Sequence, residues 1–191
     1  MSRFESAFCR TAAWGAFTRK TVLPWAVQGQ QITGDVLEIG AGSGSMAAAL
    51  VESSPDARLT ATDFDPVMVA ALSARLERYA PRARVQQADA IGLPFADASF
   101  DVVLSFIMLH HVVDWSDALA EAVRVLRPGG RLLGYDLLAT PPWRALHWIE
   151  RAPHCLLTAT QLRAALCALP VASCAVHVAP GGHVARFSAR A

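Results

Sequence analysis

The feature that most constrains this 191-residue chain is a glycine-rich stretch that runs from Val36 to Ala47. A short apolar run precedes Gly40, Gly42 and Gly44, and an alanine-rich segment follows them, which predicts strand, loop and helix. Glycine has no Cβ and accepts positive φ, so a ligand can reach the main chain there. The following helix directs its free N–H groups and positive dipole end toward the loop. The stretch therefore predicts a nucleotide-type binding corner at the carboxyl edge of an open α/β sheet.

The glycine spacing departs from the dinucleotide-binding fingerprint G-x-G-x-x-G, whose third glycine would stand at Ser45. The chain instead has Glu38-x-Gly40-x-Gly42-x-Gly44. A carboxylate two residues before the first glycine suits a ligand that brings positive charge or hydrogen-bond donors. The pattern resembles motif I of class I S-adenosylmethionine (SAM)-dependent methyltransferases. A glycine-rich turn without a ligand is the structural alternative.

Length and composition fit one α/β domain. One domain commonly holds about 100–200 residues, and a hydrophobic share of 53% suits strands that are buried on both faces of a parallel sheet. The net charge is +1 and the basic residues are scattered, so nothing favours nucleic acid as a partner. The first twenty residues lack the apolar core of a signal peptide, and no apolar stretch is long enough to span a bilayer. We therefore expect a cytoplasmic protein without stable membrane insertion.

The four cysteines carry no recognisable motif. Cys9, Cys155, Cys167 and Cys174 show no C-x-x-C spacing, so neither a metal site nor a redox motif is predicted. Buried free thiols are the expectation for all four.

Acidic residues follow the next two predicted strands. Asp63 ends a strand over residues 58–62 and lies about 20 residues beyond the glycine loop, where an acid can accept hydrogen bonds from ribose hydroxyls. That placement serves NAD and SAM equally, and the next residue, Phe64, is also predicted to bind the cofactor. Asp65 precedes Pro66 and a helical pattern, so we interpret it as a helix N-cap.

A third strand, over residues 84–87, delivers Asp89 and Ala90 to the same sheet edge. A carboxylate and a neighbouring backbone N–H there can meet the amine and a ring nitrogen of adenine. The run continues through Leu93-Pro94-Phe95 to Phe100-Asp101-Val102-Val103, and it resembles the corresponding run of the methyltransferase family. An ordinary turn role for Asp89 is the alternative.

The fourth strand, over residues 100–106, leads into Leu109-His110-His111. Enzymes that the chain resembles place the sulfonium and the acceptor just beyond this strand, which implies that Ser105, Phe106 and both histidines border the methyl group. His111 matches the histidine of the quinone- and small-molecule-methylating branch. A histidine can take a proton from an acceptor hydroxyl near neutral pH. The alternative is that one or both histidines cap the next helix or pack against the sheet.

The remaining segments complete the expected architecture. We predict a helix over 115–126, a glycine turn at 127–131, a strand over 132–138, a helix opened by a Thr158–Gln161 capping box and a closing hairpin over 171–189. The resemblance implies a single-domain, three-layer αβα sandwich with a mostly parallel seven-stranded sheet of order 3-2-1-4-5-7-6, strand 7 being antiparallel. Residues 1–31 are expected to form an N-terminal helical segment, which either packs on the sheet or closes as a lid over the ligand, and residues 32–191 the SAM-binding methyltransferase domain.

Aromatic side chains predict where an acceptor would bind. Trp14 and Phe17 lie in the N-terminal segment, and Trp143 and His147 lie in the apolar stretch of residues 139–153. These four, with His110, are the predicted substrate residues. They favour a hydrophobic or planar acceptor.

The predicted function is SAM-dependent methyl transfer to an O, N or C nucleophile of a small apolar or aromatic molecule, by in-line displacement at the sulfonium methyl. His111 and His110 are the candidate bases, and no metal is expected. The predicted cofactor-binding residues are Glu38, Gly40, Ala41, Gly42, Gly44, Asp63, Phe64, Asp89, Ala90, Ser105 and Phe106. The alternatives are other SAM-dependent chemistry on the same fold, an NAD-dependent oxidoreductase and a non-catalytic scaffold. We expect a monomer or a homodimer.

Overall fold

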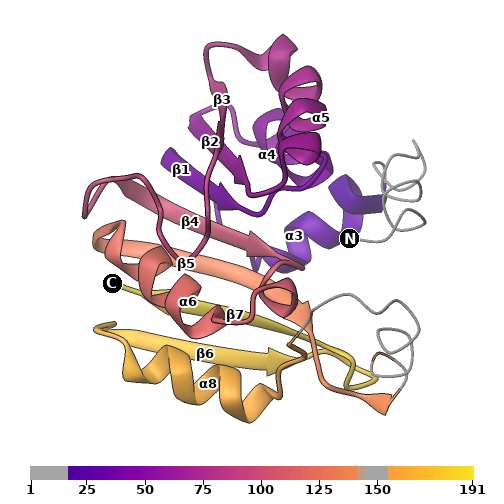
Figure 1. The fold of residues 1–191 in the computed structure, drawn as a ribbon, viewed down its shortest axis with the longest axis vertical. Coiled ribbons are helices and arrows are strands. Elements are labelled where there is room, and N and C mark those ends of the chain that lie inside the picture. The colour runs from indigo at the N-terminus through magenta and orange to yellow at the C-terminus, as the bar shows by residue number, and fades with distance from the viewer. Residues whose placement is uncertain (1–16, 142, 144–154) are drawn as a thin grey trace.

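The computed structural model describes residues 17–141, 143 and 155–191. Seven strands form one sheet in the order β3-β2-β1-β4-β5-β7-β6, which is the stack of arrows in Figure 1. The strands are β1 (Gly34–Ile39), β2 (Ala57–Asp63), β3 (Ala83–Gln87), β4 (Phe100–Phe106), β5 (Leu126–Leu137), β6 (Ser173–Val178) and β7 (Val184–Arg190). β1 to β5 pair in parallel, whereas β7 is antiparallel to both β5 and β6. The predicted sheet order and the antiparallel seventh strand are confirmed.

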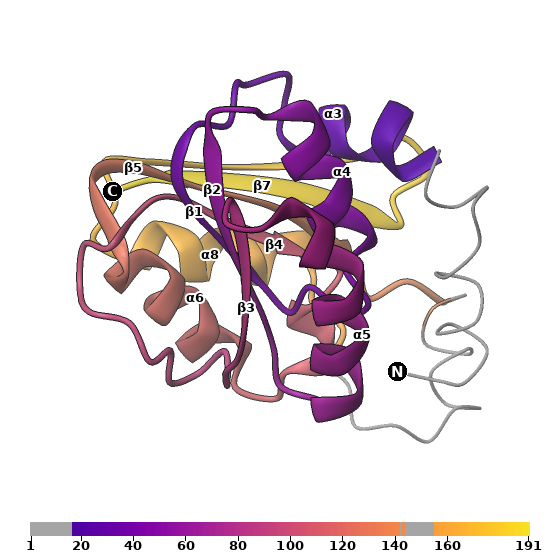
Figure 2. The same cartoon turned by 90° about the horizontal axis from the view of Figure 1, so that it is seen from above.

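Helices cover both faces of the sheet. The described helical segments are η1 (Thr18–Val22), α3 (Leu23–Ala26), α4 (Ser45–Ser53), α5 (Pro66–Leu76), η2 (Glu77–Tyr79), η3 (Leu109–His111), α6 (Trp115–Arg124) and α8 (Ala159–Ala168). Side chains of α3, α4 and α5 share one buried cluster, and those of α6 and α8 share another. Figure 2 shows α3 and α4 on one side of the sheet and α6 and α8 on the other.

The central strands contribute to both clusters. Val36 and Leu37 are neighbours in β1 and are both fully buried, yet Val36 packs with α4 and Leu37 with α6 and α8. Successive side chains of a strand point to opposite faces of its sheet. This alternation explains why the strand before the glycine loop is a continuous apolar run.

The fifth strand begins earlier than predicted. We expected a turn at residues 127–131, but β5 runs unbroken through these positions, with a shift in its pairing to β4 between Phe100 and Val102. Gly129 has a φ of +80°, and its N–H donates to the carbonyl of Ala191 at 2.8 Å. The positive φ of glycine therefore produces an irregularity inside the strand and does not end it.

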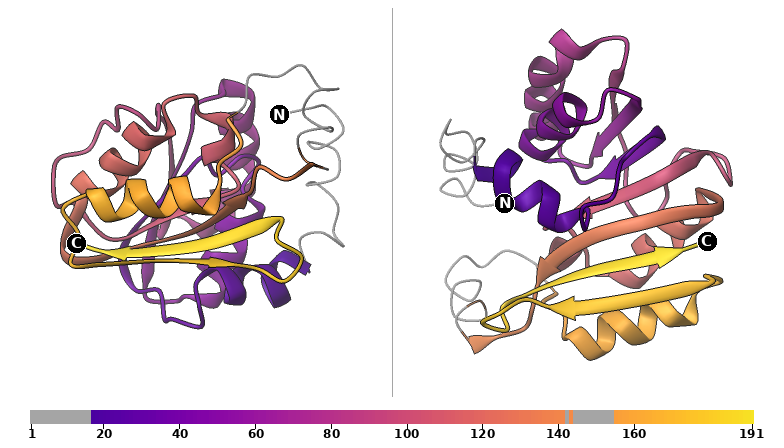
Figure 3. Two further views of the ribbon diagram at one scale, coloured as in Figure 1. Left: turned by 90° about the horizontal axis from the view of Figure 1, so that it is seen from below. Right: turned by 180° about the vertical axis from the view of Figure 1, so that it is seen from behind.

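The C-terminal part closes the sheet as expected. Thr158 Oγ1 accepts from the N–H of Gln161 at 3.1 Å, and Gln161 Oε1 accepts from the N–H of Thr158 at 3.0 Å, which confirms the capping box. Figure 3 shows the β6–β7 hairpin beside β5, with α8 next to β6.

Two of the four cysteines are paired, contrary to the expectation of free thiols. Cys167 at the end of α8 and Cys174 in β6 form a disulfide, with their Cα atoms 5.8 Å apart. The chain reverses between α8 and β6, so residues seven apart come within bonding reach although their spacing matches no motif. Cys155 is a free, half-buried thiol, and Cys9 lies outside the described residues.

Residues 17–31 pack on the sheet. Leu23 and Ala26 are buried against α4, and the Trp25 ring makes an edge contact with Tyr135, with centroids 5.4 Å apart. The described part of the N-terminal segment is therefore an element of the core. In the part of the chain that the structure describes, every helix is too short or too polar to cross a bilayer.

Candidate functional site

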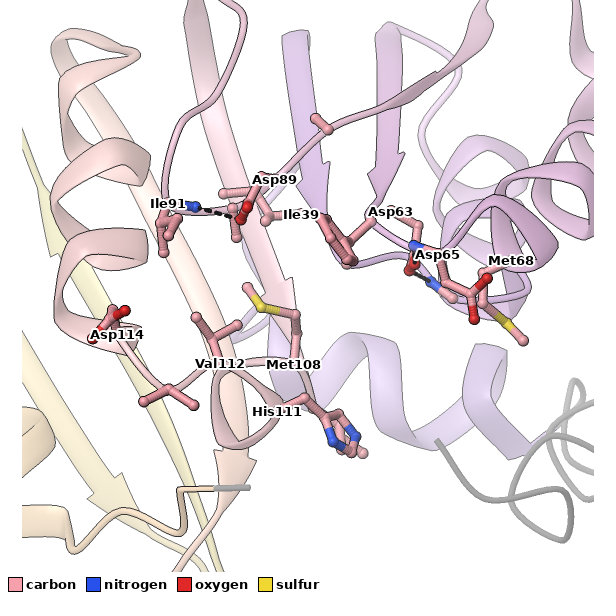
Figure 4. A pocket seen from close by; sticks show the side chains of 17 residues that line it. Ile39, Asp63, Asp65, Met68, Asp89, Ile91, Met108, His111, Val112 and Asp114 are labelled. Carbon is pink, nitrogen blue, oxygen red and sulfur yellow. Dashed lines mark hydrogen bonds between the residues drawn. The ribbon is translucent and has the colours of Figure 1, made fainter. Parts of the chain in front are cut away.

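A cavity of about 430 Å³ opens at the carboxyl ends of β1, β2 and β4. Its walls come from the glycine loop, the segment after β2, the loop after β3 and the connection from β4 to α6 (Figure 4). Cofactor sites commonly enclose about 300–1,000 Å³, so this one has room for a nucleoside-sized ligand. It lies at the sheet edge where the sequence predicted a binding corner.

The glycine loop shapes the cavity floor through two glycines. Gly40 has a φ of +66°, and a Cβ there would overlap the side chain of Met108. Gly42 has a φ of +55°, and a Cβ there would meet nothing within 4 Å. Gly40 therefore permits close packing of the β4–α6 connection, whereas Gly42 leaves its backbone open to a ligand. Ala41 and Gly44 are not among the cavity-lining residues and serve the shape of the loop, since the N–H of Gly44 donates to the Ala41 carbonyl at 2.9 Å.

Asp63 joins the loop to the end of β2. Its Oδ2 accepts from the N–H of Gly42 at 2.7 Å, and its Oδ1 accepts from the N–H of Asp65 at 3.0 Å. Burial raises the pKa of Asp63, against the effect of these two hydrogen bonds. Asp65 accepts from the N–H of Val67 at 2.8 Å, which confirms it as the N-cap of α5. The Asp63 carboxylate thus faces the cavity in a fixed orientation.

The loop after β3 supplies the opposite wall. Asp89 and Ala90 line the cavity, and Asp89 Oδ1 accepts from the N–H of Ile91 at 3.2 Å (Figure 4). Phe64 also lines the cavity, and its side chain is 69% exposed at the rim. The structure therefore brings Asp63, Phe64, Asp89 and Ala90 into one site.

Glu38 lies beneath the loop and is not part of the cavity wall. It is 2% exposed, and its Oε2 has no hydrogen-bond partner among the described residues. Burial, followed by the nearby charge of Asp63, raises the pKa of Glu38 to about 8. Ser105 Oγ on β4 is likewise buried without a partner within the described chain. Buried polar atoms are rarely left unpaired. Neither Glu38 nor Ser105 lines the cavity, so the two oxygens lie behind its wall, and this corrects the predicted place of Ser105 beside the methyl group.

The end of β4 divides the predicted acceptor residues. His111 lines the cavity, as do Met108 and Val112 (Figure 4). His110 does not: it is 1% exposed, and its Nδ1 lies 2.5 Å from Asp136 Oδ1. This corrects the predicted contact of His110 with the acceptor.

Phe106 also differs from its predicted place at the methyl group. Its side chain is 7% exposed and packs against Tyr135, with ring centroids 5.6 Å apart. The strand turns the Phe106 ring toward the buried cluster of α3 and α4, away from the cavity.

The predicted substrate residues lie largely elsewhere. Phe17 is half exposed and Trp143 is half-buried, and neither is among the residues that line the cavity. Trp14 and His147 lie outside the described residues. No group of His, Cys, Asp or Glu within the described ranges could hold a metal ion.

Several wall residues were not predicted. They are Ile39, Asp65, Met68, Ala88, Ile91, Ile107, Met108, Val112, Val113 and Asp114. Ile107 has a φ of +50°, a strained conformation for a β-branched residue. The sequence carries no signal for that conformation, although the position just after β4 marks the segment as part of the sheet edge.

A model of the methyltransferase domain family matches residues 37–134. The chain is 37% identical over 107 residues to a demethylmenaquinone methyltransferase of Thermus thermophilus, an alignment that covers 56% of this chain and 47% of that protein. It is 38% identical over 109 residues to the O-methyltransferase cnsE of Penicillium expansum, covering 56% of this chain and 39% of that protein. The matched segment therefore spans less than half the length of either relative.

Among solved structures, the fold is similar to that of the YcgJ protein of Bacillus subtilis, with a TM-score of 0.71 and 20% identity over 92% of this chain and 98% of that one. At that identity the likeness concerns the fold. The family match spans about half of the chain and includes the glycine loop, Asp63, Asp89 and both histidines. The chain therefore belongs to the methyltransferase domain family of class I SAM-dependent enzymes.

Proposed function

We propose that this protein transfers a methyl group from SAM to an uncharged, largely apolar small molecule. The observation that carries the proposal is the cavity at the carboxyl ends of β1, β2 and β4, which joins the glycine loop to Asp63 and Asp89. Four carboxylates, those of Asp63, Asp65, Asp89 and Asp114, lie among its described lining residues, and no lysine or arginine does. That charge suits a sulfonium cation and disfavours an anionic acceptor.

The residues present fit the cofactor in separate parts. Asp63 would accept from the ribose hydroxyls, Asp89 and the backbone of Ala90 would meet the adenine, and the open backbone at Gly42 would approach the methionine portion. Glu38 would support the loop from beneath. SAM supplies an electrophilic methyl group and a neutral thioether as leaving group.

The chain's own contribution is position and proton transfer. Holding the nucleophile in line with the methyl carbon can be worth about 7–11 kcal/mol in favourable cases. His111 is the imidazole among the described lining residues, and it would take the proton that a hydroxyl or carbon nucleophile loses as its bond to the methyl carbon forms. The apolar side chains of Ile107, Met108 and Val112 would exclude water around the acceptor.

The acceptor class draws support from the relatives. One is named for demethylmenaquinone and the other for O-methylation, and the chain is similar to both to nearly the same degree. A neutral planar acceptor such as a hydroquinone would agree with the names of both relatives and with the apolar side chains of the cavity wall. We further propose that residues 32–191 form the SAM-binding domain and that the protein acts as a monomer or homodimer.

The test has a binding part and a transfer part. Calorimetric titration with SAM, S-adenosylhomocysteine (SAH) and NADH should show binding of the first two and not of NADH. The protein is then incubated with SAM that carries a deuterated methyl group and with 1,4-naphthoquinol, catechol or phenylethylamine, which offer carbon, oxygen and nitrogen nucleophiles. Mass spectrometry should find the label in a quinol or catechol product. Tight binding of NADH, or SAM binding without label in any product, would contradict the proposal.

A further inference from the structure

The Asp136 carboxylate on β5 is buried at the back of the cavity wall and is satisfied on both oxygens. Its Oδ2 accepts from the N–H groups of Met108 and Leu109 at 3.0 and 2.7 Å. Its Oδ1 accepts from His110 Nδ1 at 2.5 Å and from the N–H of Leu137 at 2.7 Å. Asp136 and His110 are each 1% exposed. One carboxylate therefore holds three consecutive residues of the connection from β4 to α6.

Those three residues place both functional parts of the wall. Met108 packs into the space that Gly40 leaves, on the cofactor side. The His110 ring lies against the ring of His111, with centroids 3.9 Å apart, on the acceptor side. Asp136 is thus linked to the glycine loop through Met108, and to His111 through His110.

The turn that Asp136 holds is strained. Ile107 leaves β4 with a φ of +50°, and its N–H donates to the Tyr135 carbonyl of β5 at 2.9 Å. A strained backbone persists where its surroundings determine it from several sides. A buried apolar residue at position 136 would pack at lower desolvation cost but could hold none of these donors.

We propose that Asp136 is a positioning residue for methyl transfer, which fixes the Met108–His111 wall and, through His110, the orientation of the His111 imidazole. The inference rests on the proposed function of the cavity. Asp136, which lies outside the cavity, would thus determine the geometry of the acceptor side.

The test uses Asp136→Asn with Asp101→Asn as its matched control. An amide has one acceptor oxygen, so in Asp136→Asn one of the two donor pairs must face an NH₂ group. Asp101 is also a carboxylate that holds a backbone N–H, that of Asp35 at 2.7 Å, but at the opposite edge of the sheet. Both variants exchange a carboxylate that accepts a backbone N–H for an amide, and only Asp136→Asn does so at the wall.

Three readouts separate positioning from general stability. For 1,4-naphthoquinol, we expect Asp136→Asn to lower kcat by about 10²-fold, the scale of a small misplacement of reacting groups. We expect its Kd for SAH to rise by less than about tenfold, because Asp63 and Asp89 are untouched. In ¹H–¹⁵N spectra of the histidine side chains, the protected Nδ1–H signal of His110 should be present in the parent and in Asp101→Asn and absent in Asp136→Asn.

A second pair of variants covers the case in which Asp136→Asn does not fold. His110→Asn retains an N–H that can donate to Asp136, whereas His110→Leu does not, so His110→Asn should keep the higher kcat. Equal losses of kcat in Asp136→Asn and Asp101→Asn, or in the two His110 variants, would overturn the inference. A parent protein that neither binds SAH nor transfers label would refute the proposed function instead.

Discussion

The backbone N–H of Gly42 donates to Asp63 Oδ2 at 2.7 Å, so the loop after β1 is held by the residue that ends β2. The same carboxylate faces the cavity, and we expect Asp63→Ala to weaken SAH binding by at least about tenfold. A hydrogen bond to a charged group is worth about 1.5–3 kcal/mol, and the variant also leaves the loop N–H unpaired. Calorimetry measures the affinity. Asp101→Ala, which removes a backbone anchor at the other sheet edge, should leave the affinity unchanged; equal weakening in both variants would exclude a specific role for Asp63.

Gly40 and Gly42 offer a pair of identical substitutions with different outcomes. Gly42→Ala places a methyl group in open space, so its cost is the strain of positive φ, about 1–2 kcal/mol. Gly40→Ala carries the same strain and also a clash with Met108, and overpacking of this kind costs about a further 1–3 kcal/mol of stability. Urea unfolding should rank Gly40→Ala as the less stable variant. For each variant, the loss of SAH affinity is then compared with the loss of unfolding free energy. This ratio should be larger for Gly42→Ala, because its methyl group faces the ligand.

The buried carboxyl of Glu38 predicts a pH dependence of stability. Its pKa in the folded protein is about 8, against an ordinary value of 4.5, so the folded state holds an extra proton between these pH values. The stability that this group contributes is fully present below about pH 4.5 and is lost as the pH rises through about 8. The slope is about 1.4 kcal/mol per pH unit for one proton.

Glu38→Gln replaces the carboxyl with a neutral group of the same shape and should remove this slope. Unfolding free energies of the parent and the variant, measured from about pH 5 to about pH 8, give the comparison. Asp63 titrates in the same direction in both proteins, because burial raises its pKa also. Parallel curves for the two proteins would show that the Glu38 carboxyl is not the buried proton-binding group.

His111 should affect transfer and not cofactor binding. If it accepts the proton of the acceptor, His111→Gln lowers the rate of methyl transfer by about 10²–10⁴-fold, the usual contribution of a general base. SAH affinity should stay within about threefold, because the imidazole lies on the acceptor wall. His177→Gln, on the exposed face of β6, is the matched control. If His111→Gln transfers methyl groups at the parent's rate, His111 is not a general base, and positioning of the reactants accounts for catalysis.

The Cys167–Cys174 disulfide predicts a redox dependence of stability. It closes a short loop between α8 and β6, for which the chain-entropy estimate is about 2–3 kcal/mol. The double variant with serine at both positions should be less stable than the oxidised parent by about that amount. Under dithiothreitol the two proteins should become equally stable in urea unfolding. A parent insensitive to dithiothreitol would show that the thiols are not paired in solution.

The sequence predicted the fold and the meeting of the glycine loop, Asp63 and Asp89 at one cavity, because these depend on local order along the chain. Asp63 and Asp89 were placed from the ends of their strands, and carboxyl ends of parallel strands share one edge. The acceptor side depends on a turn that no local pattern describes. Ile107 adopts positive φ, and in the turn that follows it His111 faces the cavity while His110 faces Asp136.

Other differences arise from contacts between distant segments. Phe106 was expected at the methyl group, but its partner Tyr135 stands on the neighbouring strand and belongs to the other core. The pairing of Cys167 with Cys174 depends on the reversal between α8 and β6. In each case the deciding neighbour is set by tertiary packing and not by spacing along the chain.

Val36 and Leu37 pack into opposite cores, and this has a consequence for the binding corner. A slip of β1 by a single residue would exchange its side chains between two filled interiors, so the strand cannot slide. Packing on both faces of the sheet thereby also prevents the glycine loop at the end of β1 from shifting along the strand axis. Insertions or substitutions in the surrounding loops can then reshape the acceptor pocket without shifting the point at which the nucleoside is held.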